Sequence, residues 1–291
     1  MLVKIFCESD DFCKFFEKEV SVKFLGRNNS IGRKPSLTPS EIMTISIYFH
    51  ATKFKSFKDY YNTFIKGYLR SNFPNIVSYN RFIELRQEMM LPLLLFVKIK
   101  GLGQCDGISI IDSTTLKVCH VNRAYSHKLF KGIAQKGKNS VGWFYGFKLH
   151  CIINSQGELI NFYVTPGNVA DNNVDVLDKI TESIFGKLVG DKGYIGAFKQ
   201  LYDKGIFLIH GIRKNMKNKL MPLFDKLLLR KRGTIESVFG VLKESFSLES
   251  SKNRSQIGYF VQLFSAIAAY YFKPNKPRIF SHAELEMLCV N

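Results

Sequence analysis

The chain has 291 residues, 46% of them hydrophobic, and 42 Lys plus Arg against 24 Asp plus Glu give a formal net charge of +18. This amount of apolar material excludes a chain that is disordered throughout, because enough surface can be buried to offset the entropy lost on ordering. The strong positive charge favours a polyanionic partner, above all nucleic acid.

Neither a membrane span nor a secretion signal is indicated. The most apolar stretches, 93–97 and 260–272, are shorter than the ~20 residues that cross a bilayer. The N-terminal apolar stretch is brief and is followed at once by acidic residues. The six cysteines form no Cys-x-x-Cys pair, so we expect reduced thiols in a cytosolic protein.

The first third of the chain is predicted to be helical. Residues 38–41, Thr-Pro-Ser-Glu, have the pattern of a capping box with Pro at the first helical position. Ser56 and Ser78 each precede a further helical pattern, and the last of these helices carries Arg81. Short helices with a basic third member are similar to a helix-turn-helix arrangement. We therefore expect residues 1–105 to form a helical, DNA-binding domain; the alternative is an ordinary helical domain with exposed arginines.

From residue 106 the pattern changes to short strands. Ile108–Ile111 predict a strand that ends at Asp112, and two further strands, 143–153 and 159–165, are joined by a turn and form a hairpin. The odd-numbered residues of the second strand are apolar. This period of two predicts a half-buried strand with Trp143 in the core, and it leaves Phe144 able to stack on an unpaired base.

The rest of the chain alternates helices with short apolar strands. The predicted elements are a helix over about 173–184, a strand 188–190 that ends at Asp191, a second helix, a strand 206–209, an amphipathic helix over 235–246 and a closing helix over 260–272. The order β-β-β-α-β-α-β-α predicts an α/β fold whose mixed five-stranded sheet is flanked by helices. This second domain is expected to span residues 106–291.

The positive charge is unevenly distributed. No acidic residue lies between Asp112 and Glu158, where seven cations occur: Lys117, Arg123, Lys128, Lys131, Lys136, Lys138 and Lys148. A single lysine is most often an ordinary solvated side chain. A long stretch with cations alone repels itself unless a partner neutralises it, so this segment is a candidate DNA contact. Arg254, just before the closing helix, is another.

Three carboxylates have the positions expected of a metal centre. Asp112 and Asp191 follow strands, and Glu236 lies on a helix within about 40° of Arg232 and Lys243. Carboxylates that converge repel one another unless cations neutralise them, and Mg²⁺ or Mn²⁺ favours such oxygen ligands. Two ions about 3.5–4 Å apart would suit in-line phosphoryl transfer.

Each acid also has a purely structural alternative. Asp112 could cap the end of its strand, and Asp191 could stabilise the following glycine turn. Several other acids compete for the same role, and we rank them lower because they are expected in loops or on helical surface. They are Asp106, Asp171, Asp175 and Asp178, of which Asp171 could approach the site.

The sequence resembles the DDE transposases encoded by bacterial insertion sequences, nearly from end to end. The matching segments are Ile111-Asp112-Ser113-Thr114, His127-Lys128 to Gly132-Ile133-Ala134, Gly142-Trp143-Phe144 to Gly146-Phe147-Lys148-Leu149-His150, Thr165-Pro166-Gly167-Asn168, Asp191-Lys192-Gly193-Tyr194-Ile195-Gly196, and Arg232 through Glu236 to Lys243. Segments of this length are far more specific than three isolated acids.

The resemblance implies an RNase H-like catalytic fold in which Asp112, Asp191 and Glu236 are the three catalytic and metal-binding acids. Arg232 and Lys243 match the basic positions that flank the family's glutamate, and Lys192, Lys128, Arg254 and Arg81 complete the expected DNA contacts. Related families have a Tyr three residues before that Arg, where this chain has Leu229.

The activity implied is metal-dependent cleavage at terminal inverted repeats and transfer of the 3′-hydroxyl end into target DNA. The implied cofactor is Mg²⁺ or Mn²⁺, as two ions, and the implied partners are double-stranded DNA and a second copy of the chain on paired ends, with no membrane. The expected location is the bacterial cytoplasm, associated with the nucleoid. Two alternatives remain, a catalytically silent DNA-binding repressor and an RNase H-like nuclease. A basic RNA-packaging protein would leave the acids unexplained.

Overall fold

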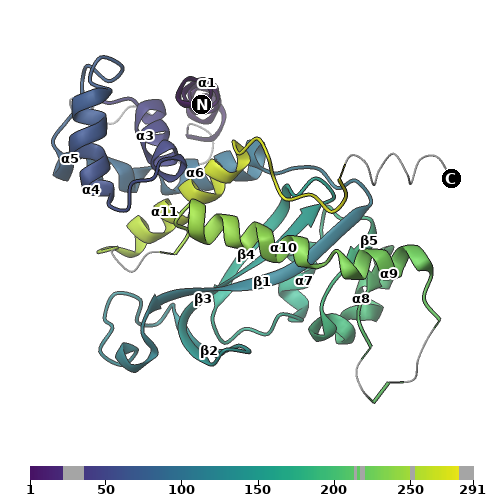
Figure 1. Ribbon diagram of the computed structural model, residues 1–291. Coiled ribbons are helices and arrows are strands. Elements are labelled where there is room, and N and C mark those ends of the chain that lie inside the picture. Colours follow the sequence, from purple (N-terminus) through teal and green to yellow (C-terminus); the bar gives the residue numbers. More distant parts are fainter. Residues whose placement is uncertain (22–35, 213–214, 217–219, 250–252, 282–291) are drawn as a thin grey trace. The chain divides into compact units, whose positions relative to one another are not determined.

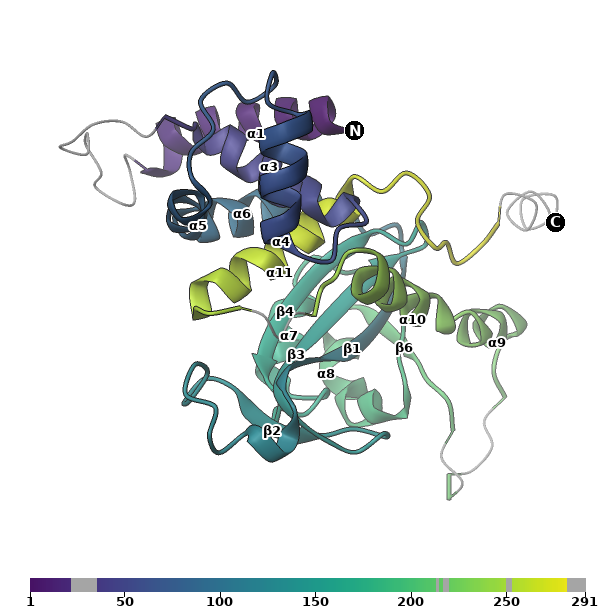
Figure 2. The same cartoon turned by 60° about the vertical axis from the view of Figure 1, so that its left-hand side comes forward.

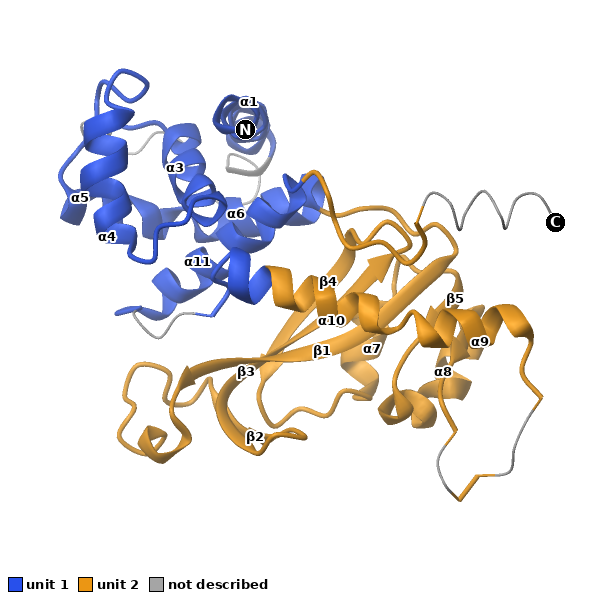
Figure 3. Cartoon of the chain, viewed as in Figure 1, with its two compact units in different colours: residues 1–101, 242–273 blue, residues 102–241, 274–291 orange. Residues whose placement is uncertain are grey.

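The computed structural model describes residues 1–21, 36–212, 215–216, 220–249 and 253–281. The chain divides into two compact units, unit 1 (residues 1–101 and 242–273) and unit 2 (residues 102–241 and 274–291), as Figure 3 shows. The first division lies close to the domain boundary expected at residue 105, and residues 242–273 are grouped with the N-terminal helices. The two units are distinguished by their compactness alone. The assignment of DNA binding to one domain and catalysis to the other stays a prediction.

Unit 1 is helical within its described residues, as the sequence predicts. Its elements are α1 (Leu2–Phe15), η1 (Phe16–Ser21), α3 (Pro39–Ala51), α4 (Phe57–Asp59), η2 (Tyr60–Tyr68), α5 (Tyr79–Glu88), α6 (Met90–Phe96), η3 (Val97–Gly101) and α11 (Gln256–Tyr271), with η6 (Val241–Ser245) leading into it. The buried helix α11 contacts α3, α5 and α6, which explains why the end of the chain is grouped with its beginning.

The predicted helix starts of unit 1 are confirmed. Thr38 Oγ1 accepts a hydrogen bond from the Glu41 backbone N–H, and Glu41 Oε2 accepts one from the Thr38 backbone N–H at 2.7 Å. These two bonds complete the capping box. Ser56 and Ser78 cap α4 and α5 through their hydroxyl oxygens.

Unit 2 is built on one mixed six-stranded sheet. Its strands are β1 (Ile108–Cys119), β2 (Gln135–Lys138), β3 (Trp143–Asn154), β4 (Leu159–Pro166), β5 (Gly186–Val189) and β6 (Ile206–Ile209). Strands β1, β3 and β4 are antiparallel neighbours, and β5 and β6 continue the sheet in parallel from β1. The short strand β2 shares an edge of β3 with β4, further along that strand. The order β2-β3-β1-β5-β6, with β4 also paired to β3, is a mixed sheet with parallel and antiparallel neighbours, so the predicted α/β fold class is confirmed.

Two sequence-based predictions about the strands are wrong. The sheet has a sixth strand, β2, whose sequence Gln-Lys-Gly-Lys carries no alternating apolar pattern and is ordered by its pairing with residues 143–146 of β3. Strand β1 does not end at Asp112 but runs on to Cys119, because every residue from Ser109 to Lys117 pairs with β3.

Helices cover both faces of the sheet. One face packs on α7 (Val174–Ile180), η5 (Lys192–Ala197) and α8 (Phe198–Asp203) around a buried apolar cluster. On the opposite face α10 (Gly233–Gly240), preceded by α9 (Leu223–Arg230), packs on β1 (Figures 1 and 2). None of the helices in the part of the chain described is both long and apolar enough to cross a membrane.

Strand β3 is not half-buried as predicted. It is buried from Phe144 onwards, on odd and even positions alike. Phe144 is 2% exposed, whereas Trp143 is 62% exposed. The expected roles of these two rings are therefore reversed: Phe144 belongs to the core and Trp143 faces solvent.

Candidate functional site

Asp112 and Asp191 lie on the same face of the sheet, where two parallel strands separate. The last residue pair between β1 and β5 is Ile110 with Val189. Asp112 follows Ile110 by two residues, and Asp191 follows Val189 by two. Since alternate residues of a strand point to the same face, both carboxylates point toward the side that α10 covers. This edge is the crevice in which ligands of α/β sheets are commonly bound.

Local structure also uses Asp191, as its structural alternative predicted. Its Oδ1 accepts a hydrogen bond of 2.7 Å from the Gly193 backbone N–H and so caps η5. A side chain at Gly193 would bring a Cβ to 2.9 Å from that oxygen. The glycine therefore leaves room for the carboxylate, and capping through one oxygen is compatible with a further ligand on the other.

Glu236 is connected to Asp112 through Arg232. On α10, Arg232 Nη2 lies 3.0 Å from Glu236 Oε1, and Nη1 of the same guanidinium lies 3.5 Å from Asp112 Oδ2. The burial of Ile235 and Val238 against the sheet fixes the helix so that this charged stripe runs along its edge. The predicted closeness of Arg232 and Glu236 on one helical face is thus observed, and Asp112 joins them.

The pKa of Asp112 is raised to about 6. Burial is the main cause, since it disfavours the charged carboxylate, and the nearby carboxylates of Asp191 and Asp171 act in the same direction. The Ser113 backbone N–H, which donates to Asp112 Oδ1 at 2.8 Å, and the Arg232 guanidinium oppose this shift. A carboxyl with a pKa near neutrality, beside other acids, is typical of functional sites.

Asp171, which was ranked lower but could approach the site, does lie near Asp112, and its partners Ser113, Lys148 and His150 were not identified as site residues from the sequence. Ser113, the residue after Asp112 on β1, donates a hydrogen bond of 2.7 Å from its Oγ to Asp171 Oδ1. Lys148 Nζ lies 3.1 Å from the same oxygen. His150 Nδ1 lies 4.0 Å from it, and burial lowers the pKa of this imidazole to about 4. The available signal was the pair Lys148 and His150, two polar residues on alternate positions of a strand that is otherwise apolar.

Tyr194 adds a buried hydroxyl near the acids. Its side chain is 1% exposed, and its hydroxyl has no hydrogen-bond partner. Burial raises the pKa of this phenol well above its usual value, and the charges of Asp171, Asp112 and Asp191 reinforce the shift. A buried hydroxyl without a partner is costly, so Tyr194 is a further polar group that belongs with the carboxylates of Asp171, Asp112 and Asp191.

The donor atoms fit a hard divalent ion, although the acids are not gathered into a closed site. Carboxylate oxygens are the ligands that Mg²⁺ and Mn²⁺ prefer. Among the residues that the structure describes, no group of three or more His, Cys, Asp and Glu side chains lies close enough to hold a metal ion. The single guanidinium of Arg232 pairs with both Asp112 and Glu236 in this arrangement.

The predicted DNA contacts fall in both units. Arg232 lies at the carboxylates, Lys192 follows Asp191 directly, and Lys128 is exposed on a turn of unit 2. Arg81, Lys243 and Arg254 belong to unit 1, where Arg81 pairs with Glu84 and Lys243 with Glu249. Of these six residues, Arg232 forms ion pairs with two of the predicted catalytic acids, Asp112 and Glu236.

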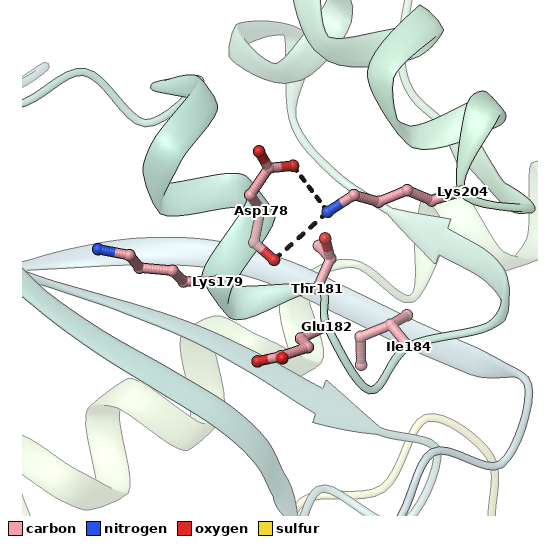
Figure 4. A pocket seen from close by; sticks show the side chains of 6 residues that line it. All are labelled: Asp178, Lys179, Thr181, Glu182, Ile184 and Lys204. Carbon is pink, nitrogen blue, oxygen red and sulfur yellow. Dashed lines mark hydrogen bonds and ion pairs between the residues drawn. The ribbon is translucent and has the colours of Figure 1, made fainter.

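A surface pocket of unit 2 lies apart from the predicted residues. It is lined by Asp178, Lys179, Thr181, Glu182, Ile184 and Lys204, and Figure 4 shows Lys204 paired with Asp178. None of the residues predicted for catalysis or DNA binding lines this pocket.

Comparison with known proteins identifies the family. Residues 102–256 match the family described as "Transposase DDE domain", which is more than half of the chain. No curated protein matches the sequence. Solved structures with some similarity include the Mos1 strand transfer complex, with 12% identity over 89% of this chain and 84% of that one at a TM-score of 0.23. A Mos1 transposase paired-end complex with the left transposon end has 14% identity over 90% and 87%, at a TM-score of 0.22. On the family match, which includes Asp112, Asp191 and Glu236, the chain belongs to the transposase DDE domain family.

Proposed function

We propose that the chain is a metal-dependent transposase that cleaves DNA at the terminal inverted repeats of an insertion sequence and joins the freed 3′-hydroxyl to target DNA. The observation that carries this proposal is the pair Asp112 and Asp191 on one face at the separation of β1 from β5, with Glu236 linked to Asp112 through Arg232. The order Asp, Asp, Glu along the chain is the order of acids after which the DDE family is named, and such acids would serve in phosphoryl transfer.

In this proposal Asp112 and Asp191 hold two Mg²⁺ or Mn²⁺ ions and Glu236 holds one of them. Bound divalent ions activate a water or 3′-hydroxyl nucleophile and stabilise the charge on the leaving oxygen. Asp112 must be ionised to serve as a ligand. Arg232 screens the carboxylates from one another, and its guanidinium is placed to meet a DNA phosphate at the same spot.

The proposed partner is double-stranded DNA, both the terminal repeats and the target, with two copies of the chain on paired ends. The contacts to the backbone are assigned to basic residues of both units: Arg232, Lys192, Lys128, Lys243, Arg254 and Arg81. A protein with this activity would work on the nucleoid in the bacterial cytoplasm.

The test is strand cleavage and joining on terminal-repeat DNA with Mg²⁺. We expect Asp112→Asn, Asp191→Asn and Glu236→Gln each to lower the rate by about 10³-fold or more, because the three acids act as one metal-binding unit and each variant removes one of its ligands. Glu182→Gln is the matched control, since this exposed carboxylate lines the separate pocket. Full activity in any of the three variants would refute that residue's assignment.

Two other outcomes would point to the alternative functions. Tight binding of repeat DNA without metal-dependent nicking would identify a repressor. Nicking without any joined product would identify a nuclease. Both differ from the proposed activity in the product formed, so one gel assay with labelled repeat and target DNA separates all three.

A further inference from the structure

Two aromatic side chains of unit 2 lie outside its core, within the stretch that has no acidic residue. The exposed fraction is 91% for Tyr125 and 62% for Trp143, whereas Phe130, Phe144 and Tyr145 of the same region are buried. Exposed rings that gather among charges of one sign mark an interaction surface more often than isolated apolar side chains do.

Each exposed ring is paired with an ammonium group. Lys136 Nζ lies 3.9 Å from the centre of the Tyr125 ring, and Lys138 Nζ lies 5.8 Å from that of Trp143. Lys138 is also the direct cross-strand neighbour of Trp143 in the β2–β3 ladder. A flat ring beside a cation matches the two parts of a nucleotide, because the ring can stack on a base while the ammonium meets a phosphate.

Trp143 and both lysines are presented by an ordered hairpin, whereas Tyr125 lies in the turn that follows η4 (Val121–Arg123). Four residue pairs join β2 to β3. In the turn between them, Asn139 Oδ1 accepts hydrogen bonds from the backbone N–H groups of Val141 and Gly142 at 3.0 and 2.9 Å. A fixed support lowers the entropy lost when a ligand stacks, so this turn favours binding.

We propose that Tyr125, Lys136, Lys138 and Trp143 form a stacking surface for unpaired bases of DNA, which we call the β2–β3 platform. In a duplex both faces of each base are covered by its neighbours, so an exposed ring gains a full stacking contact only from a base that is unpaired. The absence of acidic residues from Ser113 to Gly157 favours a polyanion here. The platform deepens the proposed transposase function, on which it rests, since strand cleavage exposes unpaired nucleotides near the cut.

The platform lies within reach of a DNA strand held at the acids. Trp143 precedes Cys151, the β3 partner of Asp112, by eight residues on the same strand. At about 3.3 Å per residue the two are separated by about 26 Å along β3. A strand of about eight stacked nucleotides, at about 3.4 Å each, spans this distance. One bound strand can therefore contact both places.

Trp143 is the only tryptophan of the chain, so its fluorescence reports on the platform directly. The experiment titrates the full-length protein, without divalent ions, with a single-stranded oligonucleotide and with a blunt duplex of the same sequence. We expect the single strand to quench most of the Trp143 emission, because the indole stacks on bases, and the duplex to quench it much less.

Affinity measurements on variants give the second arm. Trp143→Ala is expected to weaken binding of the single strand by about 5- to 150-fold, the effect of losing one stacked base, and Trp143→Phe to retain most of the affinity. Tyr202→Ala is the matched control, because Tyr202 on α8 is also 62% exposed and lies outside the platform. Since both side chains face solvent, neither variant is expected to unfold.

Three results would overturn the platform: unchanged emission when the single strand binds, equal quenching by the duplex, or equal affinities of Trp143→Ala and Tyr202→Ala. None of these measurements requires chemistry. Loss of quenching together with normal cleavage would therefore remove the platform and leave the transposase function. Normal quenching without cleavage would leave a single-strand binding surface and remove the proposed activity.

Discussion

At the residue scale, the ion pair of Lys148 with Asp171 provides a test of how unit 2 supports its acids. Lys148 is 9% exposed, and its Nζ lies 3.1 Å from Asp171 Oδ1. Asp171→Asn removes the negative charge that pairs with the buried Lys148 ammonium. We expect it to lower the free energy of unfolding by about 1–3 kcal/mol, below the loss for a fully buried pair because Asp171 is itself partly exposed.

The matched control is Asp178→Asn, which breaks the exposed pair with Lys204 at the surface pocket. A surface pair of this kind contributes about 0–1 kcal/mol. Urea unfolding followed by Trp143 fluorescence measures both, since that residue lies in unit 2. Equal losses in the two variants would show that burial of Lys148 carries no energetic consequence.

Single residues also mark what could be predicted from the sequence at the site. Asp112, Asp191 and Glu236 stood out because each follows or lies on a recognisable element, and Arg232 could be placed one helical turn from Glu236. The guanidinium contact with Asp112 and the bond from Ser113 to Asp171 join residues 120 and 58 positions apart in the chain. No local pattern encodes such contacts, because they depend on how the elements pack.

At the element scale, α3 carries a buried histidine that makes unit 1 sensitive to acid. His50 is 2% exposed, and its Nδ1–H donates to the Phe246 carbonyl at 2.6 Å. Burial lowers the pKa of His50 to about 3, and the charge of Arg86 contributes, against the backbone hydrogen bond. The unfolded imidazole takes up a proton below about pH 6.5, whereas the folded one does not until about pH 3.

The sign of the pH effect follows from this difference. Between those two pH values the unfolded state binds more protons, so the free energy of unfolding falls as the pH falls. From pH 7 to pH 5 the contribution of His50 is a loss of about 2 kcal/mol. His50→Asn keeps a donor for Phe246 and does not titrate. Urea unfolding followed by far-ultraviolet circular dichroism should show that the wild type loses this much more than the variant; parallel pH profiles would contradict the prediction.

Elements were predicted where the sequence carries a local signal. The capping residues Thr38, Ser56 and Ser78 fixed three helix starts, because a cap is a contact between residues three positions apart. Strand β2 was missed, since its polar sequence is ordered only by its partner. The faces of β3 were misassigned for a related reason: a period of two indicates one buried face, and it cannot distinguish a strand that is buried on both faces.

At the scale of the whole molecule, the net charge of +18 and the three acids are expected to control different properties. Charge governs affinity, because each phosphate that a Lys or Arg neutralises releases counterions. If about 6–10 phosphates are contacted, affinity for repeat DNA falls by about 10³- to 10⁵-fold between about 50 and 200 mM salt. Binding measured by fluorescence anisotropy of labelled repeat DNA over this range gives the slope.

Variants then separate charge from chemistry. Lys128→Ala and Lys131→Ala remove two cations of the stretch without acids and should together lower the salt slope by about two, with a similar loss of affinity for every sequence. Asp112→Asn should abolish cleavage in the assay with Mg²⁺. In the binding measurement, made without divalent ions, it should leave the salt slope unchanged, because it removes no cation. The opposite result would be a salt slope that changes in Asp112→Asn and stays the same in the two lysine variants. It would mean that the DNA backbone is held at the acids, and that the cations from Ser113 to Gly157 do not bind DNA.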